Sequence, residues 1–184
     1  MATKNKRGFT IVELMVAAAL SAIILAGVTS SFVMFVRSSI RISNYATMEA
    51  EATRALEMLA RDLRMAQAIA TDAPTGAAES RNIQQITLTV RNGSGVGTTS
   101  VVYSFDATAK TFKRVVGAVT TTLIRNVVPS TASFSAYNLN QALAANDYET
   151  NQIKISMTTS PDTKGNYATT TKRVISARFV LRNR

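Results

Sequence analysis

The sequence predicts an α+β fold in which a long N-terminal α-helix packs on a C-terminal antiparallel β-sheet. Three observations predict this fold. Residues 14–36 form an uninterrupted run of 23 uncharged residues, residues 37–70 place apolar side chains at helical spacing, and apolar side chains alternate after residue 83. A chain of 184 residues has room for one domain, or for one domain and an anchoring segment.

The composition excludes several classes of function. The sequence contains no Cys, no His and no Trp. A disulfide framework, a thiolate nucleophile, a Ser-His-Asp centre and a zinc site are therefore all excluded. We expect no catalytic residues, no metal and no cofactor, and we expect that the protein is not an enzyme.

The apolar run is long enough to cross a membrane. As a helix, residues 14–36 would extend about 34 Å, against a hydrocarbon core of about 30 Å. The basic residues Lys4, Lys6 and Arg7 precede the run, so the positive-inside rule keeps the N-terminus in the cytoplasm and exports the rest. A secretory signal peptide is an alternative, but its apolar core would be shorter and would carry a clear cleavage site. A plain transmembrane anchor fits the length but gives Gly8 and Glu13 no role.

The start of the run contains a single carboxylate, Glu13. A charge at this depth costs a few kcal/mol unless a partner pairs with it or neutralises it. A local explanation exists, because Thr10 and Glu13 have the spacing of a capping box at a helix N-terminus. The dipole of the helix also favours an acid in the first turn.

Residues 6–14 read Lys-Arg-Gly-Phe-Thr-Ile-Val-Glu-Leu, which resembles the leader of type IV pilins and pseudopilins. The resemblance implies a pilin-like fold and cleavage between Gly8 and Phe9 by a membrane-bound prepilin peptidase. It also implies N-methylation of Phe9 and a pairing of Glu13 with the Phe9 ammonium of a neighbouring subunit. Such a pairing would set the axial register of the subunits as they enter a filament.

Small residues recur along the apolar run, and Ala18, Ala22 and Ala26 are four residues apart. Such a row permits close approach of neighbouring helices, although an Ala-rich helix facing lipid explains it equally well. The run contains no Pro, whereas major pilins often carry one there. This difference favours a minor subunit or a pseudopilin.

Residues 37–70 are expected to form the amphipathic half of the same helix. Leu56, Leu59, Leu63 and Ala66 follow helical spacing, and the apolar stripe is extended upstream by Ile42, Tyr45 and Ala52. Turn-forming residues at 71–76 are expected to end the helix.

The rest of the chain is expected to form short antiparallel strands. The predicted strands are centred on residues 86–90, 101–105, 112–116, 134–137, 153–157 and 175–181. The segment 106–110 is expected to form a turn. One face of the sheet would pack on the Leu stripe of the helix, and the other would be polar and rich in Thr.

Parts of residues 54–64, 103–114 and 177–183 are similar to W-type minor pilins and J-type pseudopilins, in which subunits form a priming complex near the filament tip. The implied organisation is a leader at 1–8, a membrane and filament-core helix at 9–36, an amphipathic helix at 37–70 and a globular β domain at 71–184. The implied location is the bacterial inner membrane, with the N-terminus in the cytoplasm and the globular domain in the periplasm, and afterwards a pilus or pseudopilus. The implied partners are the peptidase and sibling pilins or pseudopilins.

The net charge of +10 is uneven, because residues 81–184 carry thirteen Lys and Arg against four Asp and Glu. A basic β domain of this kind favours an alternative function, the capture of DNA or another polyanion at a filament tip. A solvated basic surface is the simpler explanation. A calcium loop around Asp147 and Glu149 is a further alternative, although it has few carboxylates for a calcium cage.

Overall fold

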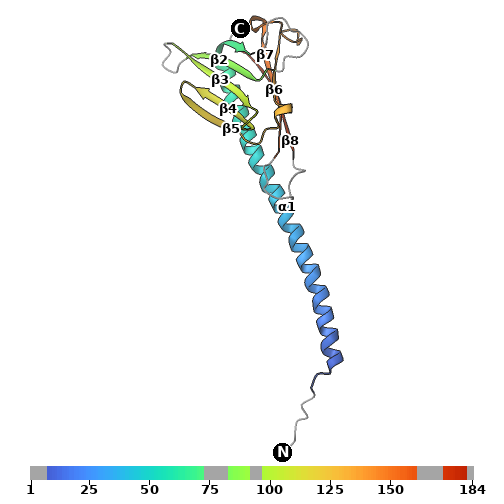
Figure 1. Ribbon diagram of the computed structural model, residues 1–184. Helices are drawn as coiled ribbons and strands as arrows, with labels where there is room; N and C mark the ends of the chain where they lie inside the picture. Colours follow the sequence, from blue (N-terminus) through green and yellow to red (C-terminus); the bar gives the residue numbers. More distant parts are fainter. Residues whose placement is uncertain (1–7, 73–82, 92–96, 161–171, 182–184) are drawn as a thin grey trace, which may run out of the picture. The chain divides into compact units, whose positions relative to one another are not determined.

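A computed structural model describes residues 8–72, 83–91, 97–160 and 172–181 (Figure 1). The chain divides into two compact units, Met1–Ile42 and Ser43–Arg184. Helix α1, Ile11–Met65, begins in the first unit and ends in the second. The units are described separately below.

In the first unit, the described residues 8–42 are all exposed. By length and composition, α1 contains a segment that could cross a membrane. Three hydroxyl groups in the apolar run bond back to the carbonyl four residues earlier: Ser21 to Ala17, Thr29 to Leu25 and Ser31 to Gly27. The helix therefore satisfies these polar groups internally, as an apolar environment requires.

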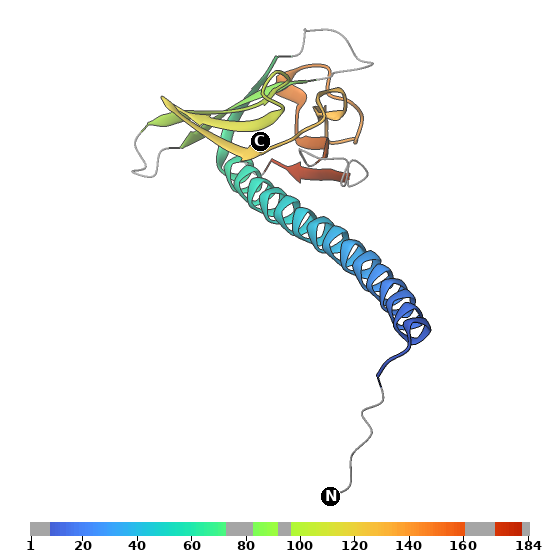
Figure 2. The ribbon, with the colours of Figure 1, turned by 60° about the horizontal axis from the view of Figure 1, so that its bottom comes forward.

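The second unit contains two antiparallel sheets. The first has five strands in chain order, β1 Ala66–Thr71, β2 Gln85–Arg91, β3 Thr98–Asp106, β4 Thr111–Val116 and β5 Val119–Ile124. The second has three, β6 Ser133–Tyr137, β7 Gln152–Thr159 and β8 Arg173–Val180. Figure 2 shows the two sheets side by side, and a bridge between Ile83 and Phe134 joins them. Two short 3₁₀ turns, η1 Pro129–Thr131 and η2 Asp147–Glu149, lie in the connections.

One hydrophobic core fills the space between the helix and both sheets. The helix contributes Ala52, Ala55, Leu59 and Leu63, and the strands contribute alternate residues such as Ile86, Leu88, Phe134, Ile153 and Ile155. Stacked and tilted rings of Tyr103, Phe105, Phe112 and Phe134 extend through it. The predicted α+β fold class, a long apolar helix with an antiparallel β region, is confirmed.

Polar contacts fix the helix to the three-stranded sheet at one end. Thr159 at the end of β7 donates to the sulfur of Met48 at 3.4 Å, and Arg173 at the start of β8 forms an ion pair with Glu49. These contacts bind the first turns of the helix in the second unit to the end of β7 and the start of β8.

The turn predicted at 106–110 is confirmed between β3 and β4. The Asp106 carboxylate accepts from the Ala109 amide at 2.8 Å and from Lys113 Nζ at 2.6 Å. The hydrogen bond from Ala109, followed by that from Lys113, holds the pKa of Asp106 below its usual range. Asp106 therefore stabilises the hairpin as an ionised acceptor.

The predicted end of the helix at residue 70 is wrong. The helix ends at Met65, and residues from Ala66 onward form β1, which pairs with β2 through a β-bulge between Ala66 and Ala68. Pairing with β2 overrides the helical preference of an Ala-rich segment. The predicted upstream stripe is also wrong in part, because Ile42 and Tyr45 are exposed and Met48 is the first buried residue of α1.

Candidate functional site

The N-terminal end of α1 is built by Thr10. Its side-chain oxygen Oγ1 accepts a hydrogen bond from the Glu13 amide at 3.2 Å, and its carbonyl accepts from the Leu14 amide at 3.1 Å. Thr10 thus acts as an N-cap and satisfies one of the free amides of the first turn. Half of the predicted capping box is therefore present.

The other half of the capping box would be a bond from the Glu13 side chain back to the chain. Within the described residues, no donor pairs with the Glu13 carboxylate. Glu13 lies in the first turn, where the helix dipole favours an anion. Its carboxylate is exposed in a surrounding of exposed apolar side chains, so it is available to a partner outside the chain.

Gly8 and Phe9 lie just before the cap. An added Cβ at Gly8 would meet no atom within 4 Å, so packing inside the chain does not require glycine there. Phe9 is 85% exposed. The predicted basic residues Lys4, Lys6 and Arg7 lie outside the described residues.

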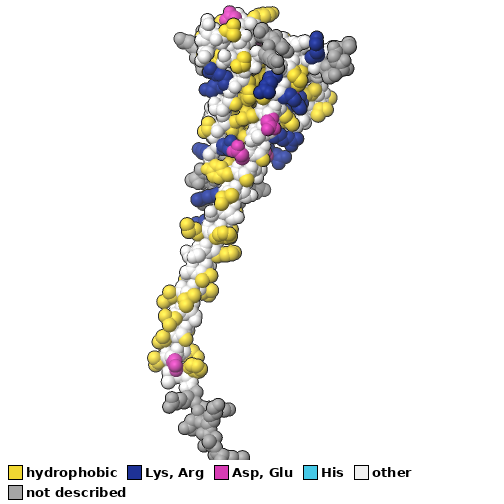
Figure 3. Space-filling model, turned by 180° about the vertical axis from the view of Figure 1, so that it is seen from behind, with side chains coloured by type: hydrophobic (Ala, Val, Ile, Leu, Met, Phe, Trp, Pro, Cys, Tyr) yellow, Lys and Arg dark blue, Asp and Glu magenta, His cyan; other side chains and the backbone are white. Residues whose placement is uncertain are grey.

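The apolar side chains that follow are exposed over the whole of the first unit. Figure 3 shows hydrophobic side chains along this part of the helix. A stretch of more than 20 exposed apolar residues would be strongly unfavourable in water. It therefore needs a covering environment, either lipid or the helices of other subunits.

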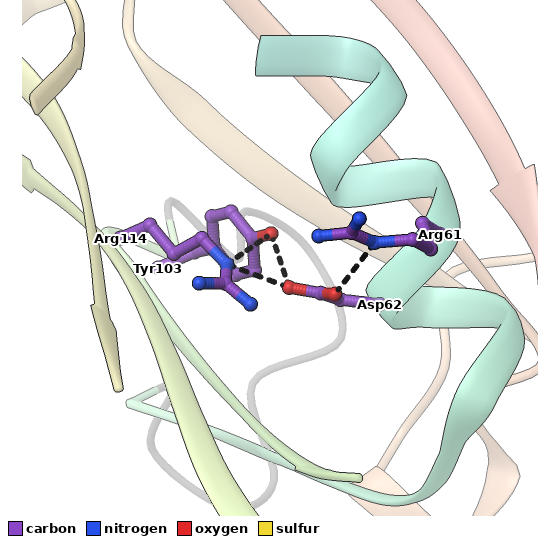
Figure 4. A network of polar contacts seen from close by, with 4 residues as sticks. All are labelled: Arg61, Asp62, Tyr103 and Arg114. Atoms are coloured by element: carbon purple, nitrogen blue, oxygen red, sulfur yellow. Dashed lines mark hydrogen bonds and ion pairs between the residues drawn. The ribbon is translucent and has the colours of Figure 1, made fainter. Parts of the chain in front are cut away.

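A second polar arrangement lies inside the globular unit (Figure 4). Asp62 of α1 is 2% exposed, and its Oδ2 accepts from the Tyr103 hydroxyl at 2.7 Å and from Arg114 Nε at 2.7 Å. Arg61 Nε lies 3.7 Å from the other carboxylate oxygen. The sequence interpretation missed Asp62, although it lies three residues after Leu59 and thus on the same helical face.

The electrostatics of this cluster indicate a structural role. Burial raises the pKa of Tyr103, and the hydrogen bond and charge of Asp62 raise it further. Burial alone would lower the pKa of Arg114, but the hydrogen bond and charge of Asp62 outweigh that effect and raise it. Tyr103 therefore stays protonated and Arg114 stays charged at neutral pH. Neither group is suited to proton transfer, and together they join the helix to β3 and β4.

The suggested calcium loop has its oxygen atoms engaged by the protein. Asp147 accepts from the amide and the hydroxyl of Thr71 at 3.1 and 2.7 Å. Glu149 accepts from the Ala145 amide and from Asn146 Nδ2. Asp147 therefore holds η2 against the end of β1, and Glu149 holds η2 to the residues just before it.

Comparison with known proteins identifies the N-terminal segment. Residues 3–29 match the family model described as the prokaryotic N-terminal methylation motif. No curated protein and no solved structure matches the chain significantly. The match covers residues 3–8 of the predicted leader, the predicted cleavage site and the first turns of α1, and it supports a type IV pilin-like prepilin signal. The combination of this motif with an exposed apolar helix and an antiparallel β region fits a membrane-anchored subunit of the type IV pilin or pseudopilin kind.

Proposed function

We propose that the chain is a minor pilin or pseudopilin that primes or caps a type IV pilus-like filament. The observation that carries this proposal is the methylation motif at residues 3–29, which overlaps the start of an apolar helix that is exposed up to residue 42. In this proposal the prepilin peptidase cleaves between Gly8 and Phe9 and methylates the new amine of Phe9. The mature chain then begins two residues before helix α1.

The chain is first held in the inner membrane. Lys4, Lys6 and Arg7 keep the leader in the cytoplasm, residues 9–36 cross the bilayer, and the globular unit lies in the periplasm. Residues 1–8 are the removed leader in this proposal. The remaining chain then moves from lipid into a filament, where the helices of sibling subunits replace lipid around the apolar side chains.

The charge of Glu13 directs the transfer of the chain from lipid into the filament. The Glu13 carboxylate has no partner among the described residues. In this proposal the cleaved neighbouring subunit brings an ammonium group at Phe9. Pairing the two removes the cost of two separate charges in an apolar setting. Because only one axial offset brings these groups together, the pairing selects the register of the entering subunit.

A minor role is favoured by the uninterrupted apolar run. Residues 14–36 contain no Pro, and α1 is helical throughout this stretch.

Deletion of the gene is expected to reduce the number of filaments strongly without changing their diameter, since a priming subunit acts at initiation. Filaments of normal number, counted by electron microscopy, would contradict the priming role.

The cleavage site is tested by replacing Gly8 with Leu and measuring the intact mass of the chain in cells that contain the peptidase. We expect the wild-type chain to lose residues 1–8 and to gain a methyl group, and the variant to keep its leader. Since a side chain at Gly8 has free space, misfolding does not explain that result. Gly27→Ala, at a helical glycine that is equally open, is the matched control and should be processed normally. A wild-type chain that still begins at Met1 would overturn the proposal.

The role of Glu13 is tested by Glu13→Gln in the presence of wild-type siblings. The variant keeps the Thr10 cap, since that bond uses the backbone amide of residue 13. We expect normal processing and membrane insertion but loss from purified filaments, measured by quantitative immunoblotting. Incorporation at the wild-type level would contradict the proposed pairing of Glu13 with a neighbouring subunit. Glu13 would then have only its place in the first turn of α1.

A second candidate function is capture of a polyanion by the globular unit. Strands β6, β7 and β8 contain Lys154, Arg173 and Arg178 and no Asp or Glu. Arg173 is paired with Glu49 of α1, and the strands themselves offer no carboxylate to Lys154 and Arg178. This local absence of acids, together with the basic excess of residues 81–184, favours an anionic partner over a mixed solvated surface.

A further inference from the structure

The three-stranded sheet has one face in the core and one face toward solvent. Residues alternate between the two along each strand, so the outward residues follow from the register. We call them the outer face of β6–β8: Ser133, Ser135, Tyr137, Gln152, Lys154, Ser156, Thr158, Val174, Ser176, Arg178 and Val180. All of them are half-buried or exposed.

Two cations lie side by side on this face. Lys154 of β7 is the direct register partner of Arg178 of β8, and Ser135 of β6 completes the row. Like charges at directly opposed positions destabilise an antiparallel pair. None of the three strands supplies a carboxylate to offset them. An anion bound from outside would remove this repulsion.

Arg178 also forms a stacking surface. Its guanidinium carbon lies 4.0 Å from the centre of the Tyr137 ring, and Nη1 lies 3.5 Å from Gln152 Oε1. To reach Tyr137 on β6, the side chain must extend across β7, so it lies along the sheet. Arg178 is exposed, which leaves one side of the guanidinium plane accessible. Unpaired bases stack on such planes and on aromatic rings.

The neighbouring side chains suit a phosphodiester backbone. Ser135, Ser156 and Ser176 surround the two cations with short hydroxyl groups, which donate to phosphate oxygens and leave the approach open. A base in a duplex is stacked between its neighbours and cannot use the Arg178 plane. The face therefore favours a single strand, whose bases can separate.

We propose that the outer face of β6–β8 binds single-stranded nucleic acid, with Lys154 contacting phosphate and the Arg178–Tyr137 stack contacting a base. This inference rests on the second candidate function, polyanion capture, and names its surface and its ligand. It does not depend on processing at Gly8.

The test uses the full, unprocessed chain in detergent micelles and a fluorescent oligothymidine of 20 nucleotides, with binding followed by anisotropy over a range of salt concentrations. The double variant Lys154→Gln/Arg178→Gln should weaken binding about tenfold or more and reduce the slope of log affinity against log salt by about 1.4. The matched control is Arg54→Gln/Arg125→Gln, which removes the same charge from exposed positions on α1 and after β5. It should leave affinity within about twofold of wild type.

Stacking is tested separately at Tyr137. Tyr137→Phe keeps the ring and should bind like wild type, whereas Tyr137→Ser should lose roughly fivefold or more. Thermal unfolding midpoints near wild type ensure that each variant is folded. The proposal is overturned if the control pair weakens binding as much as the Lys154/Arg178 pair, or if a duplex or heparin competes as well as unlabelled oligothymidine. Because the chain keeps its leader, a failure here leaves the filament proposal unaffected.

Discussion

Asp62 shows how one buried carboxylate connects the helix to the sheet. It accepts from Tyr103 and Arg114, which belong to adjacent strands β3 and β4. Its side chain is 3% exposed and that of Arg114 is 20% exposed, so water reaches an unpaired Arg114 guanidinium better than an unpaired Asp62 carboxylate. The consequences of removing either partner should therefore differ.

We predict that Asp62→Ala lowers the free energy of unfolding by about 3 kcal/mol, because it leaves the Tyr103 hydroxyl and the Arg114 charge without their acceptor. Arg114→Ala should cost at least as much, because it leaves the nearly fully buried Asp62 carboxylate without its closest cation. The double variant should cost at least about 1 kcal/mol less than the sum of the two. Urea unfolding of the full chain in detergent measures all three values. Strict additivity would mean that the two side chains do not stabilise each other.

Tyr103 adds a pH dependence. Its pKa in the folded chain is raised above the ordinary value near 10, mainly by burial. Above about pH 10 the unfolded chain loses this proton first, so it binds fewer protons than the folded chain and stability falls as pH rises. We predict that unfolding midpoints decline above pH 10 in the wild type and decline less in Tyr103→Phe. An equal decline in both would assign the effect to other groups.

At the scale of elements, strands with strict alternation could be predicted from the sequence. Ile86, Leu88 and Val90 are buried in β2 as expected, and β7 alternates in the same way. Strand β5 was missed, because its three consecutive Thr hide the alternation and because Leu123 and Ile124 are both buried beside a register shift in β4–β5. Strand β1 was missed because its Ala-rich sequence favours helix, and only pairing with β2 makes it a strand.

The candidate sites also differ in how far they could be predicted from the sequence. Gly8, Phe9 and Glu13 could be proposed from the sequence, because a processing motif is read along an extended chain and needs no tertiary structure. The division of the strands into two sheets was not predicted. The position of Lys154 opposite Arg178 depends on the pairing of two strands separated by residues 160–172, which no local pattern specifies. The role of Asp62 could not be predicted from the sequence, because it depends on which side chains of the strands face the helix.

For the whole molecule, every buried hydrophobic residue among those described lies at Met48 or later. The described part of the first unit contributes none, so the core of the second unit does not depend on it.

We predict that a chain limited to Ser43–Arg184 is soluble and folds alone, with a single cooperative thermal transition and dispersed amide resonances in NMR spectra. Leu59→Ala in that chain should lower the free energy of unfolding by about 2–5 kcal/mol, because Leu59 is fully buried. A truncated chain with near-native secondary structure but no cooperative transition would show that the core needs the apolar half of α1 after all. Retained folding would mean instead that the exposed apolar residues of α1 serve membrane and filament contacts rather than stability.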